Sequence, residues 1–122
     1  IVTGVQTCAL PISRGVAKLL ETKNGTSRDV ALFSRSRELL AMLPRDREHV
    51  FAMSGALRDK RFRDARDACG ISGTFHDMRH TAATRLAKVL SVLELCRQFG
   101  WSDPRMAMVY FNATAESIAQ RA

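Results

Sequence analysis

Closely spaced signals for helix ends constrain this chain more than any other feature of its sequence. Gly70 and Gly100 each follow a stretch with helical periodicity, at the position where glycine ends a helix. Ser91 and Glu94 have the spacing of a capping box, and Pro104 stands where proline opens a helix. Only short helices fit between these boundaries, so we expect a mainly helical fold built from short segments.

A small β-structure is predicted ahead of the helices. The turn dipeptide Asn24-Gly25 separates two stretches of alternating apolar residues, 16–22 and 28–32. Asn-Gly between such stretches favours a tight β-hairpin. The predicted fold class is therefore mainly α with a small β-hairpin or sheet edge.

The apolar spacing and the end signals place six helices along the rest of the chain. They are expected at 34–43 (capped by Ser34 or Ser36 and ended by Pro44), 56–69, 76–90, 91–100, 103–110 and shortly after Thr114. The residues expected to face inward from the third of these helices are Met78, Ala82, Leu86, Val89 and Leu90. Val50-Phe51 is expected to form a short buried stretch.

The first twelve residues differ in composition from the remainder of the chain. Residues 1–12 carry no charged side chain, whereas all the charged residues lie after them. Residues 2–12 resemble the conceptual translation of a common short-read sequencing adapter. We therefore expect residues 1–12 to be a non-native, adapter-derived segment and residues 13–122 to be the native part.

The charge balance favours a polyanionic partner. The 122 residues include 19 Lys and Arg against 12 Asp and Glu, for a formal net charge of +7. Most of the cations are arginines, whose planar guanidinium suits phosphate, so nucleic acid is the first candidate partner. A merely solvated basic surface is the alternative that charge alone leaves open.

Two further features of the composition predict the cellular compartment of the protein. The apolar runs are only a few residues long, so none is expected to span a membrane. The sequence has an odd number of cysteines and no Cys-x-x-Cys pair; the three cysteines are Cys8, Cys69 and Cys96. This pattern favours a reducing cytoplasm over a disulfide framework.

The pentapeptide His76-Asp77-Met78-Arg79-His80 holds the first cluster of chemically useful side chains. His76 and Arg79 lie three residues apart, so they share a helix face, and His80 adds to it. The N-terminus of a helix carries free N–H groups and partial positive charge. This arrangement suits a phosphodiester, although a helix cap with a packed histidine explains the same residues.

A second segment gives the cluster its context. Phe99-Gly100-Trp101 is followed by Tyr110, nine residues after the tryptophan. Together with the His-x-x-Arg pair of His76 and Arg79, this order and spacing resembles the catalytic domain of the tyrosine recombinases, the phage integrase family. The segment 22–28 also resembles that family's β-hairpin, whose lysine reaches into the DNA minor groove. The resemblance covers the chain from residue 13 to its end.

The resemblance implies a reaction and a partner. Tyr110 would be the nucleophile that forms a 3′-phosphotyrosyl bond, Arg79 would clamp the phosphate, and His76 would assist proton transfer. Lys23 would protonate the leaving 5′-oxygen and Trp101 would donate a hydrogen bond to phosphate. Lower-ranked DNA contacts are Lys23, Arg28, Arg79, His80 and Arg85.

The resemblance also implies an assembly without cofactors. The phosphotyrosyl bond conserves the energy of the broken phosphodiester, so no cofactor, ATP or metal is expected. The partners would be double-stranded DNA and, in the intact protein, three further copies in a tetramer, with a bacterial or phage origin. Ala115, Ile118 and Ala119 form an apolar stripe suited to docking on a neighbouring copy.

One departure from the family pattern bears on activity. The family carries a first arginine in a Gly-x-Arg-x-Gly-Glu-like segment upstream of the hairpin, and this chain has no such segment. Arg14-Gly15 lies too close to Lys23 and lacks the glutamate. We therefore expect an N-terminally incomplete catalytic domain that cleaves DNA poorly.

Two other functions fit parts of the sequence. A non-enzymatic helical DNA-binding module, of the helix-turn-helix type, would use the basic helices without chemistry at Tyr110. A metal site would use His76 and His80 with a cysteine such as Cys69, but Asp77 stands where a zinc protease has glutamate. Tyr110 would then be an ordinary core or interface residue.

Overall fold

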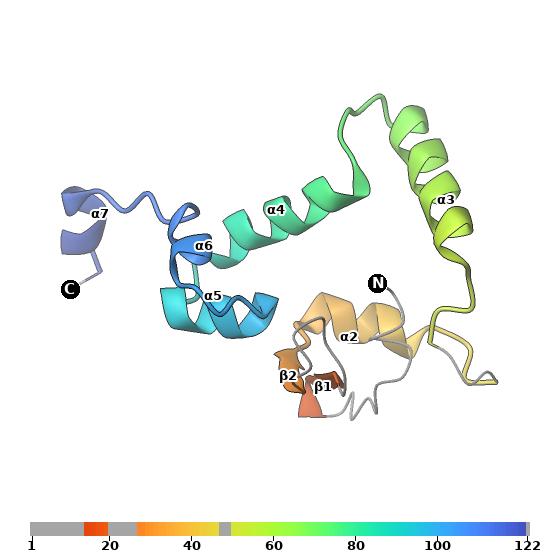
Figure 1. The fold of residues 1–122 in the computed structure, drawn as a ribbon, viewed down its shortest axis with the longest axis horizontal. Coiled ribbons are helices and arrows are strands. Elements are labelled where there is room, and N and C mark those ends of the chain that lie inside the picture. Colours follow the sequence, from red (N-terminus) through yellow and green to blue (C-terminus); the bar gives the residue numbers. More distant parts are fainter. Residues whose placement is uncertain (1–13, 20–26, 47–49, 122) are drawn as a thin grey trace. The chain divides into compact units, whose positions relative to one another are not determined.

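The computed structural model describes residues 14–19, 27–46 and 50–121, which form two compact units divided between Phe75 and His76 (Figure 1). The described part of the first unit holds a β-hairpin and two helices, and that of the second holds short helices. This confirms a mainly helical fold with a small sheet. No helix in the described ranges is both long and apolar enough to cross a membrane.

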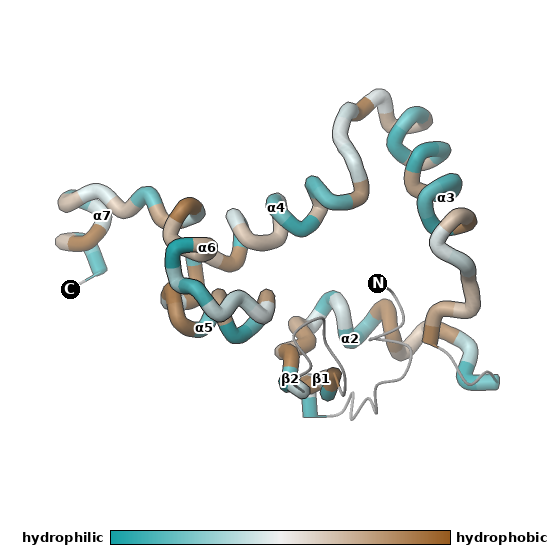
Figure 2. The backbone as a smooth tube through the Cα atoms, in the orientation of Figure 1, coloured by the Kyte–Doolittle hydropathy of each residue, from teal (hydrophilic) through white to brown (hydrophobic). Residues whose placement is uncertain are grey.

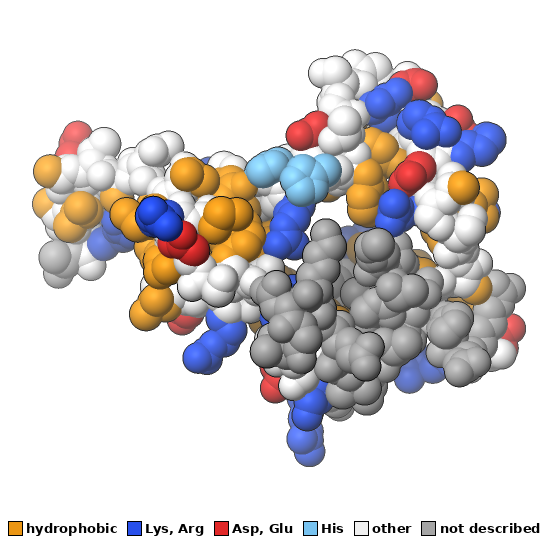
Figure 3. All heavy atoms as spheres, in the orientation of Figure 1, with side chains coloured by type: hydrophobic (Ala, Val, Ile, Leu, Met, Phe, Trp, Pro, Cys, Tyr) orange, Lys and Arg blue, Asp and Glu red, His pale blue; other side chains and the backbone are white. Residues whose placement is uncertain are grey.

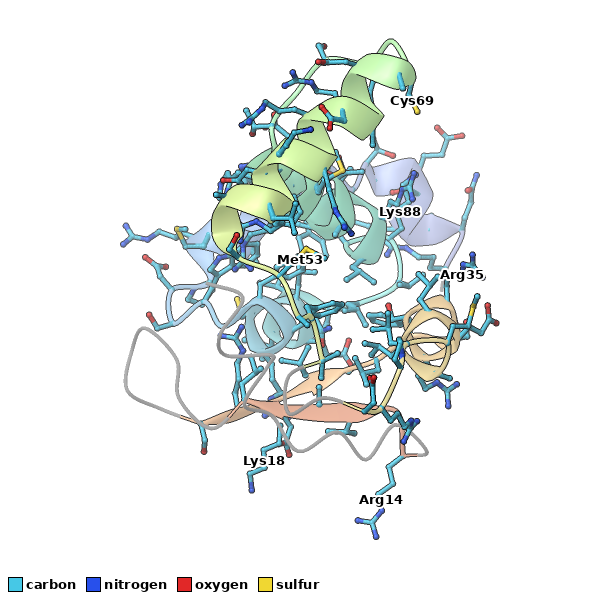
Figure 4. All side chains as sticks on the ribbon, turned by 90° about the vertical axis from the view of Figure 1, so that its right-hand side faces the viewer. Arg14, Lys18, Arg35, Met53, Cys69 and Lys88 are labelled. Carbon is cyan, nitrogen blue, oxygen red and sulfur yellow. The ribbon has the colours of Figure 1, made fainter. Side chains whose placement is uncertain are left out.

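The sheet consists of two antiparallel strands. Strand β1 (Val16–Leu19) pairs with β2 (Arg28–Ala31), and the register places Ala17 opposite Val30. Ala17 is buried at 5% exposure, while Lys18 and Arg14 point away from the strands (Figure 4). The predicted hairpin is confirmed in its strands, and the Asn24-Gly25 turn lies outside the described residues.

Helix α2 (Ser34–Ala41) departs from its prediction at both ends. Its N-cap is Phe33, and no side chain caps it, so the predicted capping by Ser34 or Ser36 is wrong. Both serines lie inside the first turn, where their hydroxyls cannot reach the free N–H groups as an N-cap does. The helix ends two residues before Leu43. Val50-Phe51 is half-buried rather than buried.

Helix α3 (Gly55–Ala68) begins and ends one residue before its predicted bounds. The Ser54 hydroxyl accepts a hydrogen bond of 3.2 Å from the Leu57 N–H, a cap that the sequence analysis missed. Gly70 adopts the left-handed conformation at φ +65°, which lets the Ile71 N–H reach back to the Arg66 carbonyl at 3.2 Å.

The polar face of α3 is largely internally paired. Lys60 Nζ lies 2.7 Å from Asp64, and Arg58 and Arg66 each pair with the aspartate that follows them. Positive and negative side chains alternate along this helix (Figure 3). Exposed pairs of this kind contribute little stability, so the face is a solvated one.

The second unit is built around a small apolar core. Its helices are α4 (Phe75–Leu86), α5 (Val92–Phe99), α6 (Arg105–Met108) and α7 (Ala115–Ala119). Leu95, Cys96 and Ala107 are buried at its centre, where α5 packs on α6. Hydrophobic residues cluster along α5 and α6 in Figure 2. Leu86, Ala87, Leu90, Val92, Phe99, Trp101, Tyr110 and Phe111 surround this centre.

Helix α4 is shorter than predicted, and its buried face is different. It ends at Leu86, after which the Lys88 and Val89 N–H groups bond three residues back rather than four. Of the residues expected to face inward, Val89 is 74% and Met78 42% exposed, so that prediction is wrong for both. Ala83, which was not predicted, is fully buried.

Helix α5 has the predicted capping box and stop. The Glu94 N–H donates to the Ser91 hydroxyl at 3.3 Å, and the Ser91 N–H donates to the Glu94 carboxylate at 2.7 Å. Gly100 at φ +73° ends the helix, and the Trp101 N–H bonds the Cys96 carbonyl at 2.9 Å. This closure sends Trp101 back toward the core.

Helix α6 stops before Tyr110, contrary to prediction. It also begins later than predicted, at Arg105 with Pro104 as its N-cap. The carboxylate of Asp103 nevertheless accepts a hydrogen bond of 2.9 Å from the Arg105 N–H. After Met108 the chain tightens into a turn in which the Tyr110 N–H bonds the Ala107 carbonyl, three residues back, at 3.0 Å. Thr114 caps α7 as expected from its position.

Candidate active site

One pocket in the second unit gathers most of the chemically useful side chains. It is open to solvent, with a volume of about 550 Å³. Both sides of the pocket come from this unit, one from α4 and the other from residues 101–110. Its walls are formed by His76, Arg79, His80, Trp101, Asp103, Arg105, Met106, Val109 and Tyr110.

The first turns of α4 place three of these side chains together. His76, Arg79 and His80 lie at helix positions i, i+3 and i+4, so they share one face. The rings of the two histidines meet edge to face, with centroids 4.9 Å apart. The exposed histidines lie beside basic residues in Figure 3. The result is a cationic surface at the start of a helix.

Arg79 is held by contacts from outside its own helix. Its Nη2 donates a hydrogen bond of 2.7 Å to the Phe99 carbonyl oxygen. The guanidinium carbon also lies 4.9 Å from the ring centroid of Phe99 and 5.6 Å from that of Trp101, within cation–π range. Burial lowers the pKa of Arg79, and the Tyr110 hydroxyl group opposes that shift. An arginine remains charged through such a change, so the pocket has a fixed cation.

Contacts at the hydroxyl and at the ring both position the Tyr110 side chain. Its hydroxyl lies 2.5 Å from Nδ1 of His80, within hydrogen-bond distance. Its ring stacks on Trp101, with centroids 5.7 Å apart and ring planes inclined by 2°. The ring is half-buried against the core, whereas the hydroxyl faces the pocket. Tyr110 therefore serves as a core residue and still presents its oxygen to a ligand.

Trp101 is the middle member of an aromatic stack. Its ring lies 4.9 Å from that of Phe99, with planes inclined by 15°, and it contacts Tyr110 on the other side. Within the described part of the chain, its indole N–H meets no hydrogen-bond acceptor. The indole thus supports Tyr110 and leaves a donor for a bound group.

An ion pair stands at the rim of the pocket. Arg105 Nη2 lies 2.7 Å from Asp103, and Arg105 Nε donates to the same carboxylate at 2.9 Å. These bonds lower the pKa of Asp103 and raise that of Arg105. The side chain of Arg105 is 86% exposed, so its outer face is accessible to an anion.

The structure brings most of the predicted site residues together. His76, Arg79, Trp101 and Tyr110 all line the pocket, and so does His80, which was ranked only as a DNA contact. Their chemical roles stay predictions.

One predicted DNA contact lies on the same unit but outside the pocket. Arg85 is exposed in the last turn of α4 and does not line the pocket. Arg28 is half-buried in β2 of the first unit, and Lys23 lies outside the described residues.

Sequence reasoning missed several members of the site. Asp103 was recognised only as a helix cap, and Arg105, Met106 and Val109 were not singled out. All of them fall within the helix predicted at 103–110, which was the signal available. The Phe99 carbonyl contact with Arg79 had no sequence signal, because it joins residues 20 positions apart through the backbone.

The described residues do not assemble a metal site. No group of three or more His, Cys, Asp or Glu side chains lies close enough among them to hold a metal ion. His76 and His80 meet ring to ring, and Nδ1 of His80 faces Tyr110.

The chain is similar in sequence to a known recombinase. A Shufflon-specific DNA recombinase from Escherichia coli is 33% identical over 116 residues, an alignment that covers 92% of this chain. The chain spans 30% of that protein's length.

Solved structures of recombinases share the fold. The crystal structure of XerA recombinase matches 98% of the chain with a TM-score of 0.67 at 14% identity, and the match covers 51% of that protein. XerH site-specific recombinase bound to its difH substrate matches 94% of the chain, with a TM-score of 0.65 at 16% identity and 38% of that protein covered.

A family match covers nearly the whole chain. It extends over residues 5–117 and therefore begins within segment 1–12, whose adapter origin stays a prediction. With the His-x-x-Arg helix, the tryptophan and the tyrosine on one pocket, the chain belongs to the phage integrase family, the tyrosine recombinases.

Proposed function

We propose that this chain carries the nucleophile of a site-specific DNA recombinase. Tyr110 attacks a phosphodiester of duplex DNA, forms a 3′-phosphotyrosyl bond and releases a 5′-hydroxyl, which a second strand later replaces. The observation that carries this proposal is the placement of the Tyr110 hydroxyl, His80 and Arg79 on one open pocket. The similar recombinases support the same reaction.

Each side chain that is proposed to act in this reaction has a separate task. Arg79 neutralises the non-bridging oxygens, where charge builds in the transition state. The free indole N–H of Trp101 donates to one of the same oxygens. His76 lies beside this phosphate position, and Lys23 supplies the proton to the leaving 5′-oxygen. Because the phosphotyrosyl bond stores the energy of the broken bond, rejoining requires no cofactor.

The proposed partners are duplex DNA and further copies of the chain. The net charge of +7 favours the polyanion, and DNA binding is expected to weaken steeply with salt. On α7, Ile118 is 54% exposed beside Ala115 and Ala119, which suits docking on a neighbouring copy in a tetramer. The setting that we infer is the cytoplasm of a bacterium that carries the recombination site.

Covalent trapping tests the proposal on a single peptide. Tyr110 is the only tyrosine, and trypsin releases it within residues 106–121. The chain is incubated with a library of nicked duplexes in which cleavage is irreversible, and the peptide is examined by mass spectrometry. With guanidinium ion present in place of the family's first arginine, we expect this peptide to carry a nucleotide in the wild type and never in Tyr110→Phe.

The same experiment separates an enzyme from a binding module. A helical DNA-binding module without chemistry would retain duplexes in both proteins and yield no modified peptide in either. That result, obtained with guanidinium ion present, would overturn the proposal.

A further inference from the structure

The two histidines of α4 make different contacts, which separates their roles. We propose that His80, rather than His76, holds the Tyr110 hydroxyl and accepts its proton when the tyrosine attacks DNA. This inference rests on the proposed function. It assigns to His80 a role that the sequence pattern alone would give to the histidine of the His-x-x-Arg pair.

The contacts distinguish the two rings. Nδ1 of His80 lies 2.5 Å from the Tyr110 oxygen, and the two ring centroids are 6.1 Å apart. Within the described residues, His76 makes no hydrogen bond to Tyr110, and its ring contacts the edge of His80 instead. A general base must lie within hydrogen-bond distance of the proton it removes, and His80 meets that condition.

The fold fixes this pair from both sides. His80 lies in the second turn of α4, four residues after His76. Tyr110 is held by its N–H bond to the Ala107 carbonyl and by the stack on Trp101. These contacts restrict rotation of the Tyr110 ring. The hydrogen bond to the His80 imidazole then fixes the direction of the Tyr110 O–H bond.

The proton and electron pairs balance in this assignment. The Tyr110 oxygen forms a bond to phosphorus as the bond from phosphorus to the 5′-oxygen breaks, and the phenolic proton passes to Nδ1 of His80. That nitrogen has a lone pair when the imidazole proton resides on Nε2. The leaving oxygen takes a proton from a different acid, for which Lys23 is proposed. In rejoining, His80 returns its proton to the tyrosine.

Charged side chains share the pocket with the His80–Tyr110 pair. Arg79 on α4 and Arg105 on α6 both line the pocket, and Asp103 is engaged with Arg105. The ring of His76 meets that of His80 edge to face.

Nuclear magnetic resonance tests the pairing on the chain itself, without DNA. The chain has three histidines, of which His49 serves as an internal reference. Imidazole nitrogen shifts are expected to report the Nε2–H tautomer of His80, with Nδ1 accepting. Tyr110→Phe should remove the hydrogen-bond shift at Nδ1 of His80 and alter His76 much less. The assignment would be overturned if the His80 nitrogen shifts did not change in Tyr110→Phe, or if the His76 nitrogen shifts changed instead.

A reactivity test separates the base from the acid. The trapping experiment is repeated with guanidinium present and with duplexes that carry sulfur at the bridging 5′-position, a leaving group that needs no proton. His80→Phe is expected to lower adduct formation by a factor of about 100 on both oxygen and sulfur substrates. Lys23→Ala, the matched control, should be rescued by sulfur.

The outcomes distinguish the two proposals. Equal adduct from His80→Phe and wild type would refute the role of His80 while leaving Tyr110 as the nucleophile. No adduct from the wild type, with the His80–Tyr110 bond intact by resonance, would refute the recombinase proposal instead. Trp101 fluorescence, from the only tryptophan, verifies that each variant is folded.

Discussion

The guanidinium of Arg79 donates a hydrogen bond of 2.7 Å to the carbonyl oxygen of Phe99. This bond joins the first helix of the second unit to the end of α5, just before Gly100 sends the chain toward Trp101. Arg79 therefore supports the segment that carries the aromatic stack, in addition to presenting charge to the pocket.

Replacing Arg79 by lysine is expected to impair both functions. Lysine cannot reproduce the planar fork or the stacking on Phe99 and Trp101. We expect Arg79→Lys to destabilise the fold by about 1 kcal/mol and to lower Tyr110 adduct formation about 100-fold. Urea unfolding followed by Trp101 fluorescence and the trapping experiment measure these effects. Arg97→Lys, at an exposed position on α5 outside the pocket, should change neither quantity appreciably.

The core beneath the site depends on Leu95. Its side chain is fully buried at 0% exposure, whereas Leu93 on the same helix is 72% exposed. Leu95→Ala is expected to cost about 3 kcal/mol of unfolding free energy, because it leaves a cavity under Trp101 and Tyr110. Leu93→Ala is the matched control and should change the denaturation midpoint little. Equal losses from both variants would contradict the described core.

The capping box of α5 gives stability that depends on pH. Hydrogen bonds from Ser91 lower the pKa of Glu94 below its usual value of 4.5. The ionised form is the one favoured by folding, so this contribution is present at neutral pH and is lost as the pH falls through the lowered pKa. The stability difference between wild type and Glu94→Ala, which removes the carboxylate that accepts the Ser91 N–H, should therefore be smaller in acid than at neutral pH.

Helix α3 supplies the control for that measurement. Ser54 caps it through the Leu57 N–H, and no acidic residue lies in its first turn. Ser54→Ala is expected to cost about 1 kcal/mol, with no comparable change between neutral and acid conditions. A stability contribution from Glu94 that stays constant down to low pH would contradict the role of its ionised carboxylate.

No Gly-x-Arg-x-Gly-Glu-like segment occurs in these 122 residues, so we expect that a cation supplied from solution can raise the yield of the reaction. We propose that this chain binds duplex DNA but forms little adduct, because only Arg79 clamps the phosphate. Guanidinium ion, at concentrations well below those that denature, should supply the second cation and raise the yield of the modified 106–121 peptide. Equal concentrations of sodium chloride and urea are the controls. Abundant adduct without guanidinium would show that Arg79 suffices.

The elements that the sequence predicted well are those fixed by neighbouring residues. The strand pair and the α5 capping box with its Gly100 stop depend on contacts within a few positions, so their signals are local. The end of α4 and the end of α6 were predicted too late. In both places the main-chain hydrogen bonds change from a spacing of four residues to one of three, as the chain turns back to cover Leu95. No residue pattern near either turn predicts this change.

The family, the short helices and the residues able to carry the chemistry can all be predicted from the sequence. Which of these residues act together depends on how the chain packs. Arg79 meets Phe99 across 20 positions and His80 meets Tyr110 across 30. Such contacts depend on the path of the chain between them, because helix ends and core packing set the angle at which distant segments meet. Spacing placed both histidines near the tyrosine, and packing brought His80 to its hydroxyl.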